Sequence, residues 1–193
     1  MLMGAACGCG AAKISPGDDI PLALPMSNSE YYAAFADATT GAIADPTLLK
    51  NRIQDGGIDK ELRATLWLRL FGVLAWADPA PRATLEEKRR EYDALKAQWE
   101  GFEGNLGSCT VEAVKAHHQV IKNDVDRTDR KGPIFQEDGG ALDALRRVLL
   151  SFCCSDLGSE LGYFQGMNDM AAVILSVYDW REVTRLWMRA TQP

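Results

Sequence analysis

The amino-acid sequence predicts an all-α protein, and two observations support that class. Apolar residues recur at intervals of three and four along several windows, which places them on one face of a helix. No stretch alternates apolar and polar residues over the length of a strand, as a half-buried β-strand would. The expected architecture is therefore a set of amphipathic helices packed around apolar cores.

Five helices follow from this spacing. The first carries leucines at every fourth position and is expected to end near Asp78. The second is highly charged, and Thr84 and Glu87 at its start have the spacing of a capping box. The predicted helices begin after Gly57, at Thr84, near Thr110, after Gly140 and after Gly166.

The apolar stripes of two of these helices predict which of their side chains are buried. On the third helix, His118 falls on the apolar stripe and is expected to be a core residue. On the fifth helix, the residues expected to face the core are Met167, Met170, Ile174 and Val177.

The composition is typical of a globular protein that works in water. Acidic side chains outnumber basic ones by 27 to 21, which gives a formal charge of −6. Nucleic-acid binders that neutralise phosphates carry the opposite sign, so we expect no nucleic-acid partner. No apolar run approaches the roughly 18 residues of a membrane span, so no transmembrane segment is expected. Five cysteines without paired CxxC motifs indicate reduced thiols in the cytoplasm and no metal site.

Residues 1–28 are predicted to be a flexible segment, and residues 29–193 to form the folded domain. The first segment is rich in Gly and Ala and then in Pro, without a helical period. Acylation of Gly4, with Cys7 and Cys9 close behind it, is an alternative that the residue pattern supports less well.

Two short polar segments do not fit a simple division into core and solvated surface. At the end of the third helix, Asp124 and Arg127 are three residues apart and share a helical face, so the carboxylate can orient the guanidinium. In the second segment, Gln165 stands between Tyr163 and Gly166, just before a helix. Glycine permits unusual backbone angles, and glutamine offers a donor and an acceptor that can orient a water molecule.

The spacing of these residues resembles the TBC domain of Rab GTPase-activating proteins. The pattern Ile-x-x-Asp-x-x-Arg-Thr stands at residues 121–128, and Tyr-x-Gln-Gly stands at residues 163–166. The resemblance extends over residues 29–180. Further matches upstream are Gly-Gly-Ile at 56–58, Leu-Arg-x-x-Leu-Trp at 62–67 and Phe-Gly at 71–72.

The resemblance implies that Arg127 is an arginine finger and Gln165 a glutamine finger, both supplied in trans to a Rab-type small GTPase in its GTP form. The chain would then activate a GTPase and would not be an enzyme with its own substrate. GTP and Mg²⁺ would belong to the GTPase, so no cofactor is expected in this chain. Its location would be cytoplasmic and, through the GTPase, peripheral to endomembranes. The residues with implied supporting roles are Asp124, Thr128, Tyr163, Gly166, Arg63 and Trp67.

A TBC domain has two helical halves and continues well beyond the glutamine motif, whereas this chain ends at Pro193. We therefore expect a TBC-type domain with its N-terminal subdomain largely present and its C-terminal subdomain mostly missing, which would leave an apolar helix face exposed. Two alternatives to an activator stay open: a TBC-like half-domain that binds partners without accelerating hydrolysis, and an inactive truncated gene product. The presence of both Arg127 and Gln165 favours the activator, because a binding module needs neither.

Overall fold

The computed structural model describes residues 23–37, 39–128, 133–136 and 140–178. Within these ranges the chain is helical, and its β-type pairing is limited to isolated bridges from Met26 to Ile58 and from Ala36 to Ile43. The expected all-α class is confirmed. The elements are α1 (Asn28–Ala34), α2 (Pro46–Gly56), α3 (Lys60–Leu70), α4 (Pro81–Glu100), the 3-10 helix η1 (Leu106–Ser108), α5 (Glu112–Arg127), α6 (Pro133–Gln136), α7 (Gly140–Phe152), α8 (Asp156–Leu161) and α9 (Met167–Val177).

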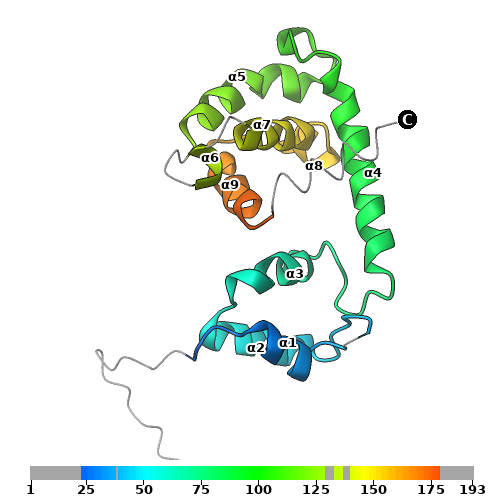
Figure 1. Cartoon of the computed structure of the whole chain (residues 1–193). Helices are drawn as coiled ribbons and strands as arrows, with labels where there is room; N and C mark the ends of the chain where they lie inside the picture. Colours follow the sequence, from blue (N-terminus) through cyan, green and yellow to red (C-terminus); the bar gives the residue numbers. More distant parts are fainter. Residues whose placement is uncertain (1–22, 38, 129–132, 137–139, 179–193) are drawn as a thin grey trace, which may run out of the picture.

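These helices form two lobes, and the long helix α4 joins them along one side (Figure 1). Each lobe has its own apolar core. The core of the first lobe, built from α1 to α3 and their loops, contains Met26, Tyr31, Ile43, Leu49, Leu62 and Leu66. The core of the second lobe, built around α5, α7 and α9, includes Trp99, Val114, Ile121, Leu145, Leu149, Leu150 and Tyr163.

Two arginines hold the first lobe together. On α2, Arg52 makes a two-point contact with Glu30 of α1, at 2.6 and 2.9 Å. On α3, the buried Arg69 donates to the backbone carbonyls of Gly41 at 3.0 Å and Trp76 at 3.1 Å. Because hydrogen bonds from a charged donor are stronger than neutral ones, Arg52 ties α2 to α1, and Arg69 fixes two loops that have no regular structure of their own.

The packed region begins before the boundary predicted between residues 28 and 29. Met26 is completely buried in the first core. Its N–H donates to the Gly57 carbonyl at 3.1 Å, and its carbonyl accepts from Asp59 N–H at 3.1 Å. Residues 1–22 of the predicted flexible segment lie outside the described residues, so the flexibility of that segment stays a prediction.

The first predicted helix is real but shorter than expected. The structure ends α3 at Leu70, and Gly72 adopts a left-handed φ of 74°. The chain then turns back, so that Leu74 N–H donates to the Leu68 carbonyl at 2.9 Å and the Leu74 side chain is buried. The four-residue leucine spacing continues past the end of the helix because Leu74 is buried from the loop that follows α3.

The start of α4 also differs from the predicted capping box. The helix begins at Pro81, whose fixed φ suits the first helical position. Thr84 therefore lies inside the first turn, and its hydroxyl donates to Asp78 Oδ2 at 2.7 Å. Glu87 pairs with Arg90 on the exposed face. Asp78, from the preceding loop, is the residue that organises this end of the helix.

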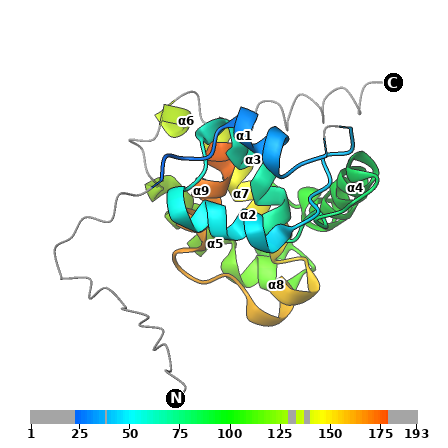
Figure 2. The same ribbon diagram turned by 90° about the horizontal axis from the view of Figure 1, so that it is seen from below.

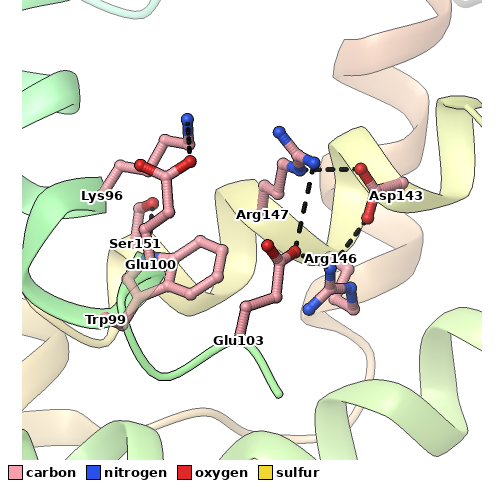
Figure 3. Close-up of polar contacts among 8 residues, drawn as sticks. All are labelled: Lys96, Trp99, Glu100, Glu103, Asp143, Arg146, Arg147 and Ser151. Atoms are coloured by element: carbon pink, nitrogen blue, oxygen red, sulfur yellow. Dashed lines mark hydrogen bonds and ion pairs between the residues drawn. The ribbon is translucent and has the colours of Figure 1, made fainter. Parts of the chain in front are cut away.

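The C-terminal end of α4 is fixed to α7 by a buried tryptophan and a group of ion pairs (Figure 3). Trp99 is completely buried, and its indole N–H donates to Ser151 Oγ at 3.0 Å. The ion pairs join Glu103 and Asp143 to Arg146 and Arg147. Because ion pairs near the surface contribute little, Trp99 is the main anchor between the two helices.

The predicted apolar stripe of α9 is correct for Met167, which packs against the second core, and wrong for Met170 and Ile174. Met170 is 69% exposed and Ile174 is 40% exposed, whereas Asn168 and Ala172 are buried. The helix packs against the second core through Met167, Ala171, Ala172 and Leu175, and the polar Asn168 is buried beside them. Among the described residues, Met170, Val173 and Ile174 are left on the surface.

Adjacent leucines on α2 provide a matched test of the first core. Leu49 is completely buried and Leu48 is 55% exposed. We expect Leu49→Ala to lower the free energy of unfolding by about 2–5 kcal/mol, because it leaves a cavity. Leu48→Ala should change it by no more than about 0.5 kcal/mol. Urea unfolding of both variants measures the difference, and equal losses would contradict the placement of this helix.

Candidate functional site

Arg127 is the last residue of α5, and its side chain is exposed. The helix stops there because Thr128 adopts an extended conformation, with φ −56° and ψ 144°. The last carbonyls of a helix have no partner within it. Here the Thr128 hydroxyl donates to the carbonyl of Asp124 at 3.0 Å. The positive charge of Arg127 is also favourable at this end of the helix dipole.

Gln165 is exposed at the corner of a tight turn between α8 and α9. The turn is closed by a hydrogen bond from Met167 N–H to the Phe164 carbonyl at 3.2 Å. Gly166 has φ 98° and ψ −13°, and no described residue other than glycine has a positive φ. This combination is that of a type II turn, which requires glycine at its third position.

A buried hydrogen bond joins the two segments. The Tyr163 hydroxyl donates to Asp124 Oδ2 at 2.9 Å, across 39 residues of sequence. Both residues are less than a tenth exposed. Figure 2 shows the segment that follows α8 running beside α5 before it enters α9. The arginine and glutamine segments are therefore neighbours in space.

Asn168, on the first turn of α9, adds further contacts between the same segments. Its amide nitrogen donates to Thr128 Oγ1 at 3.0 Å and lies 3.4 Å from the Asp124 carbonyl. Its amide oxygen lies 3.3 Å from the Tyr163 hydroxyl. Asp124, Thr128, Tyr163 and Asn168 thus form one buried polar network, which we call the Asp124 network.

The electrostatics of the network keep the tyrosine protonated. Burial, reinforced by the hydrogen bond to the Asp124 carboxylate, raises the pKa of Tyr163 well above its usual range. A neutral phenol is a hydrogen-bond donor at any physiological pH. The carboxylate therefore keeps its donor, which a buried anion needs.

The Asp124 carboxylate does not hold the Arg127 guanidinium, in contrast to the orientation expected from their spacing. It faces inward, toward Tyr163. Among the described residues, the Arg127 side chain has no hydrogen bond or ion pair. Asp124 can therefore act only on the backbone that carries Arg127, and the guanidinium is left exposed.

Two predicted supporting residues lie away from this network. Arg63 is exposed and Trp67 is half-buried on α3, in the first lobe, where Trp67 makes an edge contact with Phe71 at 5.5 Å between ring centres. Just past the end of α9, the Tyr178 hydroxyl donates to the Ala64 carbonyl of α3 at 3.1 Å. The structure brings Asp124, Thr128, Tyr163 and Gly166 together and leaves Arg63 and Trp67 on a separate surface.

Two residues near the site were not predicted from the sequence. Asn168 could have been found as a polar residue at the start of an otherwise apolar helix. His117 lies against Gly162, where an added Cβ would come within 2.4 Å of His117 Nε2. The predicted core residue His118 is only half-buried, and its Nδ1 lies 2.9 Å from the Lys115 carbonyl.

Other features of the described residues do not suggest a second site. An open groove of about 610 Å³ lies between η1, α5 and α7, and its charged side chains include the pairs Lys122–Asp126 and Arg146–Asp143. In the described part of the chain, no cluster of His, Cys, Asp or Glu could hold a metal ion. None of the described helices is both long and apolar enough to cross a lipid bilayer.

The fold and the site together define a class of protein. It is an all-α domain in which a buried polar network joins two segments, one exposing an arginine and the other a glutamine. The sequence profile of the Rab-GTPase-TBC domain family matches residues 60–190, which include both segments. The chain belongs to the Rab-GTPase-TBC domain family.

Curated relatives agree with this assignment. Human TBC1 domain family member 17 is 33% identical over 178 residues, covering 91% of this chain and 26% of that protein. Human TBC1 domain family member 25 is 30% identical over 170 residues, covering 86% of this chain and 23% of that protein. The Schizosaccharomyces pombe relative named GTPase-activating protein gyp7 is 29% identical over 150 residues, covering 67% of this chain and 19% of that protein. The chain thus spans about a quarter or less of the length of these relatives.

Two glycines test the importance of the Gln165 turn for stability. An added Cβ would meet nothing within 4 Å at Gly166 or at Gly101. The two sites therefore differ mainly in φ, which is 98° at Gly166 and −62° at Gly101. Gly166→Ala should lower the free energy of unfolding by about 1–2 kcal/mol, because an L-residue is strained there. Gly101→Ala should be neutral or stabilising by about 0.4–1 kcal/mol. Urea unfolding measures both, and a neutral Gly166→Ala would contradict the left-handed turn.

Proposed function

We propose that this chain is a GTPase-activating domain for a Rab-type small GTPase in its GTP form. Arg127 and Gln165 act in trans on the GTP bound by the partner. One observation carries the proposal: the Asp124 network joins the backbones of the two segments and leaves both functional side chains exposed. A relative that is named a GTPase-activating protein supports the same function.

The chemistry requires these two side-chain types. During hydrolysis, charge develops on the transferred phosphoryl group, and a water molecule must be held in line with it. The guanidinium of Arg127 would stabilise that charge with a planar set of donors, which lysine lacks. The amide of Gln165 would accept from the water and donate to the phosphoryl oxygens, so that the water is oriented.

The supporting residues would act at two places. Asp124, Thr128, Tyr163 and Gly166 would hold the backbone of the two fingers, because each has a structural contact or a required φ in those segments. Arg63 and Trp67 would support the first lobe or contact the GTPase from α3.

GTP and Mg²⁺ would be brought by the GTPase, and this chain would supply no cofactor. The domain would act in the cytoplasm and would meet its partner at the surface of endomembranes, where the GTPase anchors it. Catalysis would then depend on side chains that the GTPase itself does not provide.

The first variant to test is Arg127→Ala. We expect it to lower the accelerated rate of GTP hydrolysis by about 10³–10⁵-fold, since an arginine finger contributes that much. Arg127→Lys should recover little of the rate. Single-turnover hydrolysis on a panel of Rab GTPases measures the effect, and Arg90→Ala, an exposed arginine on α4, is the control. A wild-type rate for Arg127→Ala would rule out the arginine assignment.

The second variant is Gln165→Ala. We expect hydrolysis to slow by about 10²–10³-fold, which is the cost of removing one positioned hydrogen-bonding group from a transition state. Binding of the GTPase should be largely unchanged, because the amide acts on the water. Calorimetry and hydrolysis assays separate the two effects, and exposed Gln54 on α2 is the matched control. Binding by wild type without acceleration of any Rab would support a non-catalytic binding module in place of the proposed activator.

A further inference from the structure

We infer that Asn168 is a positioning residue that couples the Arg127 segment to the Gln165 turn, so that the two fingers keep one relative geometry. Its catalytic consequence rests on the proposed function, whereas the coupling itself is a property of the fold. Asn168 is not one of the two finger residues. It lies three residues after Gln165 and touches the helix end that carries Arg127.

The contacts of Asn168 use both ends of its side-chain amide. The nitrogen donates to Thr128 Oγ1 at 3.0 Å and to Asp169 Oδ1 at 2.9 Å, and lies 3.4 Å from the Asp124 carbonyl. The oxygen faces the Tyr163 hydroxyl at 3.3 Å. The residue is 6% exposed, so water cannot replace these partners. The Asn168 side chain therefore contacts both the end of α5, at Asp124 and Thr128, and the glutamine segment, at Tyr163.

Asparagine suits this position because it is short and offers donors and an acceptor together. Alanine would leave the buried polar groups of Thr128 and Tyr163 with fewer partners, and an unsatisfied buried group is costly. Aspartate would lose the donors and would place a second carboxylate close to Asp124. Neither replacement preserves the connection between α9 and the end of α5.

A second contact fixes the other end of the glutamine segment to the same helix. Gly162 has φ 68°, and His117 of α5 packs so closely on it that any Cβ would lie 2.4 Å from Nε2. The segment from Gly162 to Asn168 is thus held at both ends by α5, which also carries Arg127. This helix serves as the common support for both fingers.

Coupling of this kind acts on geometry and not on affinity. Catalytic groups must be held close to their productive positions, and small displacements cost much of the rate. Loss of Asn168 should therefore reduce kcat and leave the affinity for the GTPase little changed.

The experiment measures amide hydrogen–deuterium exchange in the full chain, which needs no GTPase. Thr128→Val removes a hydroxyl from the α5 side only. If the segments are coupled, exchange should rise at least tenfold both at residues 124–128 and in the turn at residues 163–167. Asn168→Ala should give the same pattern, and Asn51→Ala, an exposed asparagine on α2, should not. Exchange that rises only next to the Thr128 substitution would overturn the coupling.

The kinetic arm separates positioning from general destabilisation. In an activity assay, Asn168→Ala should lower kcat about tenfold or more with KM nearly unchanged, and should have no further effect in the Arg127→Ala, Gln165→Ala double variant. An equal loss in both backgrounds would overturn the positioning role. If wild type stimulates no GTPase while exchange shows the coupling, the proposed function fails and the coupling stands.

Discussion

The buried carboxylate of Asp124 is the constraint on which the candidate site depends. It lies in the last turn of α5, where the helix dipole disfavours a negative charge, and it is 8% exposed. A buried anion is tolerated only when donors satisfy it, and the Tyr163 hydroxyl does so at 2.9 Å. Because Tyr163 comes from the segment between α8 and α9, that segment must lie against α5 for the second lobe to close.

The same two segments supply both the buried network and the exposed functional residues. In the first, Asp124 and Thr128 face inward while Arg127 is exposed; in the second, Tyr163 faces inward while Gln165 is exposed. Each exposed side chain is thus flanked by residues that fix its backbone. The two side chains themselves are exposed to a partner. The fold therefore fixes the backbone positions of Arg127 and Gln165 and does not fix their side-chain conformations.

Helical periodicity was sufficient to predict the all-α class and the helices α3, α4, α5, α7 and α9, but it missed α2, which at eleven residues is as long as α3 and α9. It could not predict where helices stop, because Leu74 keeps the leucine spacing while it is buried from a loop. It was also wrong for Met170 and Ile174 of α9, which are exposed, since Asn168 is drawn inward by partners 40 and more residues away in sequence. The spacing of Asp124 and Arg127 indicated an ion pair, but the better partner for the carboxylate was a tyrosine that no local pattern reveals. Arg127, Gln165 and their neighbours were recognised through family spacing. The position of Asn168 in an apolar helix is a sequence signal, but its partners, and the contact of His117 with Gly162, follow only from the three-dimensional structure.

The residues that match the family lie in both lobes, and one hydrogen bond links the end of α9 in the second lobe to α3 in the first. Arg63 and Trp67 lie on α3, whereas the Asp124 network lies wholly in the second lobe. The Tyr178 hydroxyl, just past the end of α9, donates to the Ala64 carbonyl on α3 at 3.1 Å. Since α9 begins at the Gln165 turn, this short helix connects α3, which carries Arg63 and Trp67, to the glutamine segment. The Asp124 network then connects that segment to Arg127. An influence of Arg63 or Trp67 on the geometry of the fingers can therefore pass through the position of α9, in addition to the connection that α4 makes between the lobes (Figure 1).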